Sequence, residues 1–124
     1  MMHTTERSRY FPFERLEAYR LSKVMLRFVR ERQAQLRGLP GKGAEQINRA
    51  VWGTHTALCS GSACEGAEAR RHFRMSLSEA VEMAGTLDGA LEYRVLSESE
   101  YAFGRETLLR LCACLRGLAN PRRR

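Results

Sequence analysis

Apolar side chains recur at three- and four-residue steps along most of the chain, the spacing that places side chains on one face of an α-helix. The clearest series runs from residue 73 to residue 91, and a second runs from residue 101 to residue 118. They predict a helix that begins between residues 65 and 70 and ends near 95, and another that begins near Glu98. Ser97 and Glu100 form a capping-box pattern at the start of the latter. The two series consist of Phe73, Leu77, Ala80, Ala84, Leu87 and Leu91, and of Tyr101, Gly104, Leu108, Leu111, Leu115 and Leu118.

Two further helices are predicted in the first half of the chain. The first runs from about Phe13 to Leu36, and the loop RGLPGKG ends it because glycine and proline interrupt helices. The second runs from about Ala44 to Ser60. Its inward positions are mostly small, which would let a neighbouring backbone come close: Ile47, Ala50, Thr54, Ala57 and Gly61.

This pattern predicts an all-α fold, a single up-down-up-down antiparallel four-helix bundle. The bundle would occupy residues 13–118, after a flexible N-terminal segment, 1–12, and before a basic tail, 119–124. No strand pattern, glycine-rich phosphate loop or internal repeat is visible in the sequence.

Charge is distributed unevenly along the chain. The net charge is +7, but residues 1–49 carry eleven basic and five acidic side chains, and residues 65–106 carry five basic and nine acidic ones. The last eighteen residues add five arginines. Such basic segments suit contacts with phosphates or carboxylates, although a GC-rich genome produces the same excess of arginine. No apolar run is long enough for a membrane span and no secretory leader is visible, so we expect a cytoplasmic protein.

Chemistry-bearing residues are few, and we expect neither an enzyme nor a bound metal or other cofactor. Cys112 and Cys114 point apart on a helix, so they are poorly placed to bind one zinc ion together with Cys59 and Cys64. His55 and Cys59 are spaced as a possible pair, for which we expect a packing role.

Two further groups have alternative interpretations. His72 lies among Arg70, Arg71 and Arg74, either in a solvated helix start or in an anion-binding patch. The carboxylate pairs Glu79/Glu82 and Asp88/Glu92 have a spacing found in di-metal bundles. The chain has no Glu-x-x-His, so we expect a solvent-exposed acidic face there.

Three short strings carry a family resemblance: Phe13-x-x-Leu16-Glu17-Ala18-Tyr19, Gln46-x-x-Arg49-Ala50 and Ala80-Val81-Glu82. In their order and spacing they resemble the four-helix-bundle proteins encoded in intervening sequences of bacterial 23S ribosomal RNA genes. A related branch comprises the accessory variability determinants of diversity-generating retroelements. The resemblance covers about residues 13–118. At Ala57 to Gly61 the chain lacks the asparagine and glutamate of the Asn-Ile-Ala-Glu-Gly-like run that is usual in the family.

The resemblance implies a ring-like homopentamer without known catalytic residues. For the retroelement branch it also implies a basic surface that contacts nucleic acid and a reverse transcriptase. The function expected first is therefore self-assembly as an interaction scaffold, in which arginines of the first helix pair with the acidic third helix of a neighbouring copy. The alternative is sequence-independent binding of RNA or DNA. We expect no exposed aromatic residues interleaved with the basic ones, which counts against base stacking.

Candidate site residues follow from these two functions. Trp52, the only tryptophan, flanks the inward face of its helix and either covers the edge of the core or anchors a subunit interface. The candidate nucleic-acid contacts are basic residues of the first helix and of the tail: Arg20, Lys23, Arg27, Arg30, Arg122, Arg123 and Arg124.

Overall fold

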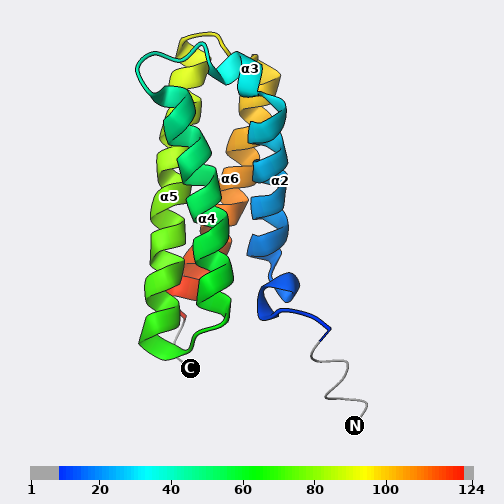
Figure 1. The fold of residues 1–124 in the computed structure, drawn as a ribbon, viewed down its shortest axis with the longest axis vertical. Coiled ribbons are helices and arrows are strands. Elements are labelled where there is room, and N and C mark those ends of the chain that lie inside the picture. The colour runs from blue at the N-terminus through cyan, green and yellow to red at the C-terminus, as the bar shows by residue number, and fades with distance from the viewer. Residues whose placement is uncertain (1–8, 122–124) are drawn as a thin grey trace.

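A computed structural model describes residues 9–121 of the chain, which are helical and contain no strand (Figure 1). The predicted all-α class is confirmed. No helix among these residues is long and apolar enough to cross a membrane. The elements are a 3₁₀ turn η1 (Pro12–Arg15) and the α-helices α2 (Glu17–Glu31), α3 (Gln33–Leu36), α4 (Gly43–Ser62), α5 (Gly66–Glu92) and α6 (Glu98–Ala119).

The four long helices surround one core. Helix α4 packs on α2 and α5, and α6 packs on the same two helices. Helices α2 and α5 consequently lie on opposite sides of the molecule (Figure 1). The α3–α4 and α5–α6 connections lie at one end, and the α4–α5 connection lies at the other. The exposed face of α2 and the exposed face of α5 therefore point away from each other.

Small residues on α4 hold α5 close. The five predicted inward positions of α4 are all buried, as expected. At Gly61 a Cβ atom would lie only 2.9 Å from the ring of Phe73, so the close approach depends on glycine here. The Ser76 hydroxyl donates a 2.7 Å hydrogen bond to the backbone oxygen of Thr54 and joins the two helices further along.

The core face of α5 is rotated slightly from the predicted series. Phe73, Ala80 and Leu87 are buried as expected, whereas Leu77, Ala84 and Leu91 are half-buried. Small or flexible side chains one position earlier are buried instead, because they fit the narrow space against α4 and α6: Ser76, Met83 and Ala90.

The prediction of one continuous helix from Phe13 to Leu36 is wrong at two places. Leu16 has extended backbone (φ −83°, ψ 134°) and separates η1 from α2. Arg32 (φ −112°, ψ 20°) separates α2 from α3. The break at Arg32 is stabilised by its side chain, which lies 4.0 Å from the centre of the Phe28 ring and donates a 3.0 Å bond to the Phe28 carbonyl.

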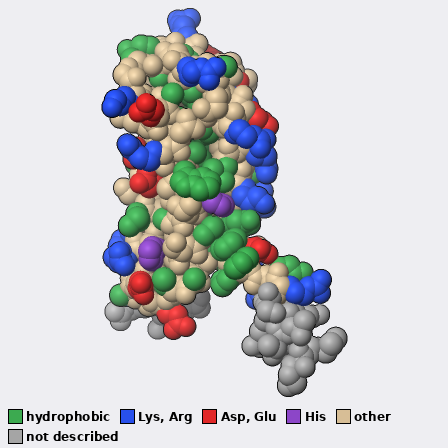
Figure 2. All heavy atoms as spheres, viewed as in Figure 1, with side chains coloured by type: hydrophobic (Ala, Val, Ile, Leu, Met, Phe, Trp, Pro, Cys, Tyr) green, Lys and Arg blue, Asp and Glu red, His purple; other side chains and the backbone are tan. Residues whose placement is uncertain are grey.

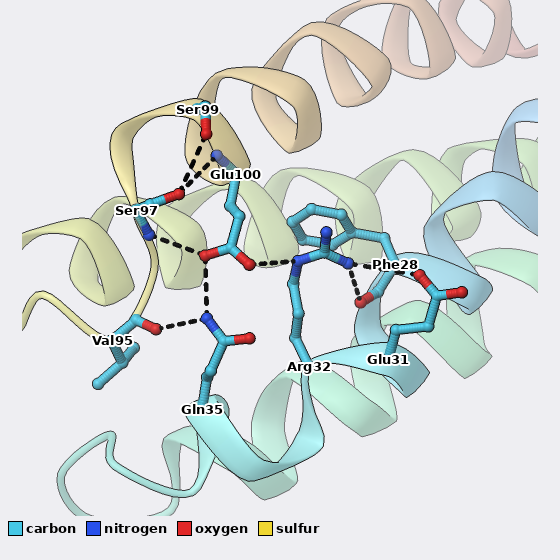
Figure 3. Close-up of polar contacts among 8 residues, drawn as sticks. All are labelled: Phe28, Glu31, Arg32, Gln35, Val95, Ser97, Ser99 and Glu100. Atoms are coloured by element: carbon cyan, nitrogen blue, oxygen red, sulfur yellow. Dashed lines mark hydrogen bonds and ion pairs between the residues drawn. The ribbon is translucent and has the colours of Figure 1, made fainter.

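Glu100 connects this break to the start of α6 (Figure 3). Its carboxylate accepts hydrogen bonds from Arg32 Nε (3.1 Å), Gln35 Nε2 (2.9 Å) and the backbone N–H of Ser97 (2.9 Å). The Ser97 hydroxyl accepts in turn from the Glu100 backbone, which completes the predicted capping box. These bonds lower the pKa of Glu100, the Ser97 N–H contributing most.

We predict that Glu100→Gln lowers the free energy of unfolding by about 1–2 kcal/mol at neutral pH, because charge-assisted hydrogen bonds are lost. Since the folded-state pKa lies below the reference value of 4.5, this stabilisation is present above about pH 4.5 and is lost as pH falls through the folded-state pKa. Urea unfolding at fixed protein concentration measures it. Glu98→Gln, an exposed change in the same helical turn, is the control. Equal effects of the two changes at neutral pH would contradict the assignment.

Candidate functional site

The four basic residues predicted on the first helix all lie on α2 and are exposed; we call them the basic stripe (Arg20, Lys23, Arg27 and Arg30). Arg20 is bound to Glu17 by a 2.6 Å contact, and Arg30 lies 3.9 Å from Glu31. Arg27 forms no ion pair within residues 9–121. Much of this positive charge is thus available to a partner. The other predicted contacts, Arg122, Arg123 and Arg124, lie outside the described residues.

Aromatic rings lie beside the basic stripe in a continuous series, which we call the aromatic row. Adjacent ring centres are 5.4 Å (Phe11–Phe13), 4.9 Å (Phe13–Tyr19), 5.6 Å (Tyr19–His55) and 6.3 Å (His55–Trp52) apart. Lys23 Nζ lies 5.1 Å from the Tyr19 ring centre and connects the row to the stripe. Figure 2 shows hydrophobic side chains and a histidine next to a column of Lys and Arg side chains on this face.

The expectation that exposed aromatic residues are lacking near the basic ones is therefore wrong. Phe11 is 64% exposed and Trp52 is 62% exposed. Phe11 comes from the segment just before η1, and Trp52 comes from α4, 22 residues after Arg30. The packing of η1 and α4 against α2 places the rings of the aromatic row together.

Trp52 lies at the edge of a shallow groove between α2 and α4. The groove is lined by Arg27 and Arg30 of the basic stripe, by Asn48 and by apolar side chains of both helices. A tryptophan exposed to this extent contributes little to covering the core, since most of its surface is in contact with solvent. Its assignment to a subunit interface stays a prediction.

Helix α5 presents negative charge on the other side of the molecule. From residue 75 onward it carries four carboxylates and no basic residue, and none of them forms an ion pair within residues 9–121. Asp88 accepts a 2.6 Å hydrogen bond from Tyr101. We call these residues the acidic side: Glu79, Glu82, Asp88 and Glu92.

Glu79 differs from the expected solvent-facing acidic residue. Its carboxylate lies against Gly53 of α4, where a Cβ atom would be 3.1 Å from Glu79 Cδ. Its Oε1 atom is buried without a hydrogen-bond partner within the described residues. Glu79 is therefore half-buried against α4, unlike the exposed Glu82, Asp88 and Glu92.

An apolar groove lies on the surface between α5 and α6, next to the acidic side. Its walls include Val81 (55% exposed), Leu109 (49% exposed) and Tyr101. Gly85 is an exposed residue of the same lining, and a Cβ atom there would meet nothing within 4 Å. The groove can therefore accept a bulky side chain from outside. Arg105, Arg116 and Asp88 form its polar margin.

The proposed pairing of His55 with Cys59 is present in space. Cys59 Sγ lies 3.9 Å from His55 Nε2, and Ser22 Oγ lies 2.9 Å from His55 Nδ1. Because the Ser22 hydroxyl donates to the Tyr19 carbonyl, it accepts a bond from Nδ1–H, which leaves Nε2 as the acceptor facing the thiol.

The surroundings of His55 and Cys59 favour the neutral form of both side chains. Burial raises the pKa of the Cys59 thiol, and burial together with the charge of Lys23 lowers the pKa of His55. A nucleophilic cysteine needs the opposite shift toward thiolate. The geometry thus offers no activated nucleophile and fits the packing role expected of His55.

Comparison of the chain with models of known protein families, with curated proteins and with solved structures finds no match.

Proposed function

We propose that this chain is a non-enzymatic helical protein of the cytoplasm that assembles with copies of itself and acts as an interaction scaffold. In this proposal α2–α3, α4, α5 and α6 form one up-down-up-down antiparallel four-helix bundle. The four free cysteines are compatible with a reducing compartment. The observation that carries the proposal is the opposite charge on α2 and α5, on opposite sides of the molecule.

The placement of the two charges favours a head-to-tail contact. A two-fold dimer through α2 would bring basic stripe against basic stripe, and one through α5 would bring carboxylates together. Contact between α2 of one copy and α5 of the next pairs opposite charges instead. The stripe from Arg20 to Arg30 and the segment from Glu82 to Glu92 each contain eleven residues, and their ends are about 15 Å apart along the helix. A head-to-tail contact that repeats from copy to copy produces a ring when the last copy meets the first.

Trp52 and the α5/α6 groove supply the apolar part of the same contact. Trp52 projects from the face that carries the basic stripe, and the groove adjoins the acidic side. The open space over Gly85 suits an indole ring. Tryptophan in a desolvated pocket is typical of the residues that dominate interface energies.

We propose that the ring contains five copies, because the family resemblance implies a homopentamer. Light scattering of the purified chain tests the proposal. It should give one species of about 71 kDa, five times the chain mass of 14.2 kDa. A mass of 14.2 kDa at micromolar concentration would reject self-assembly.

The second candidate is binding of single-stranded RNA or DNA, which the aromatic row beside the basic stripe favours. Side chains of this kind track a phosphate backbone and stack on bases without reading their sequence. In the retroelement branch of the resemblance, the same surface would also be the one to contact a reverse transcriptase.

For that candidate, replacing the basic stripe by glutamine should weaken binding of a labelled single-stranded RNA by more than about tenfold, while the oligomer persists. Fluorescence anisotropy over a range of salt concentrations measures this, and wild-type affinity should fall steeply as salt rises. Gln replacement of Arg37, Lys42, Arg71 and Arg74 is the charge-matched control. No binding by the wild type in low salt would exclude the function.

A further inference from the structure

Three side chains at the α4–α5 connection bring together a thiol, a carboxylate and an imidazole. The ligand atoms of Cys64, Glu68 and His72 all lie within 4.8 Å of one another. None of the three side chains forms a hydrogen bond or an ion pair within residues 9–121. We propose that they bind a divalent transition-metal ion of the zinc type. This site is separate from the basic stripe, the aromatic row and the α5/α6 groove.

The backbone holds these residues together. Cys64 lies in the turn after α4, where its N–H donates a 3.1 Å bond to the Gly61 carbonyl. Gly66, with φ +60°, lets the chain reverse into α5, and glycine adopts this conformation without strain. Glu68 and His72 then follow one helical turn apart, on one face of α5. Cys64, at the end of the turn, is next to that face.

Gly61 lies against His72 at this end of the molecule. A Cβ atom on Gly61 would lie 3.1 Å from His72 Cβ, so the helix ends are in close contact at this point. Both Cys64 and His72 are half-buried, whereas Glu68 is exposed. The site is therefore open on the carboxylate side, where an ion can enter and a water molecule can remain bound.

The types of ligand atom in the site favour some metal ions over others. Sulfur and imidazole nitrogen with one carboxylate oxygen suit Zn²⁺ and Co²⁺ and do not suit Mg²⁺ or Ca²⁺, which prefer all-oxygen sites. Tetrahedral zinc ligands at 2.0–2.3 Å from the metal lie about 3.5 Å apart. The ligand atoms here lie within 4.8 Å of one another, and rotation of the exposed Glu68 side chain and of the thiol can bring them to the shorter distance. Three protein ligands leave the fourth position to water.

Two opposing electrostatic contributions act on an ion at this site. Arg70, Arg71 and Arg74 follow on the same helix and disfavour a cation. A Cys64 thiolate and the Glu68 carboxylate together neutralise Zn²⁺, and the thiol proton is released when the metal binds. Affinity should consequently rise with pH.

Titration of the full chain with Co²⁺ tests the site. We expect one ion per chain, a thiolate-to-cobalt charge-transfer band and loss of that band when one equivalent of Zn²⁺ is added. Cys64→Ser should abolish the band, and His72→Gln should weaken Zn²⁺ binding by more than about 100-fold, because loss of a direct ligand exceeds the 10–100-fold effect of outer-shell changes.

Cys59→Ser is the matched control, since Cys59 belongs to the other cysteine–histidine pair and should leave the band unchanged. Far-UV circular dichroism of the metal-free variants verifies that each is folded. A wild-type chain without a charge-transfer band overturns the proposal. A band that persists in Cys64→Ser and disappears in Cys59→Ser overturns it as well.

Discussion

Arg27→Glu combined with Arg30→Glu is expected to dissociate the assembly into monomers of 14.2 kDa. In the proposed contact these two exposed side chains of α2 face the acidic side of a neighbouring copy. Reversing them places like charges together, which costs several kcal/mol at an interface. The affinity between subunits should fall by more than about 100-fold, measured by light scattering over a dilution series.

Restoration by the opposite change is the decisive part of this experiment. Glu82 and Glu92 are exposed on α5 and form no ion pair among the described residues. Glu82→Arg with Glu92→Arg should also dissociate the wild-type assembly. A chain that carries all four changes, or an equimolar mixture of the two double variants, should assemble again.

Arg37→Glu with Lys42→Glu alters net charge equally, but outside the basic stripe, and is the control. Dissociation by this control would mean that total charge, and not the α2–α5 contact, governs assembly. Failure of the four-change chain to assemble would contradict the pairing of α2 with α5.

Trp52→Ala is expected to weaken assembly by at least about 30-fold, the equivalent of the 2 kcal/mol that defines a dominant interface residue. Because Trp52 is 62% exposed, its removal should leave the helical fold unchanged. Tyr93→Ala removes another exposed aromatic, 60% exposed at the end of α5, and should not change the mass.

Gly85→Leu tests the same contact from the other side. A leucine at this exposed helical position should raise monomer stability by about 0.5–1 kcal/mol, because glycine is a poor helix former. It would also fill the α5/α6 groove and should therefore prevent assembly. Gly117→Leu, at an exposed glycine of α6 outside the groove, should raise stability without altering the mass. Assembly of Gly85→Leu at wild-type affinity would contradict the insertion of Trp52 into the groove.

Local spacing was sufficient to predict α4, α5 and α6. Their apolar positions, the capping box at Ser97 and the glycine-rich loops all act within a few residues. The break at Arg32 was not predictable in this way. Its local sequence is compatible with a continuous helix, and the interactions that stabilise the break include a bond to Glu100, 68 residues away.

Some features of the candidate surfaces likewise follow from local sequence spacing, and others depend on tertiary packing. Exposure of the basic stripe follows from its helical spacing, whereas the aromatic row joins Tyr19 of α2 to His55 and Trp52 of α4, which only tertiary packing brings together. The unpartnered oxygen of Glu79 also depends on close packing against Gly53. The Cys64, Glu68 and His72 set is different: its regular four-residue spacing is visible in the sequence, but Cys64 precedes α5, so helical spacing alone does not place it beside the other two.

Native mass spectrometry of the wild-type chain, with the ratio of its absorbance at 260 and 280 nm, tests the central claim of self-assembly most directly. The account predicts one closed species of about 71 kDa, five times the 14.2 kDa chain, with the absorbance ratio of nucleic-acid-free protein. A monomer at micromolar concentration would contradict it, as would a species that forms only together with bound nucleic acid.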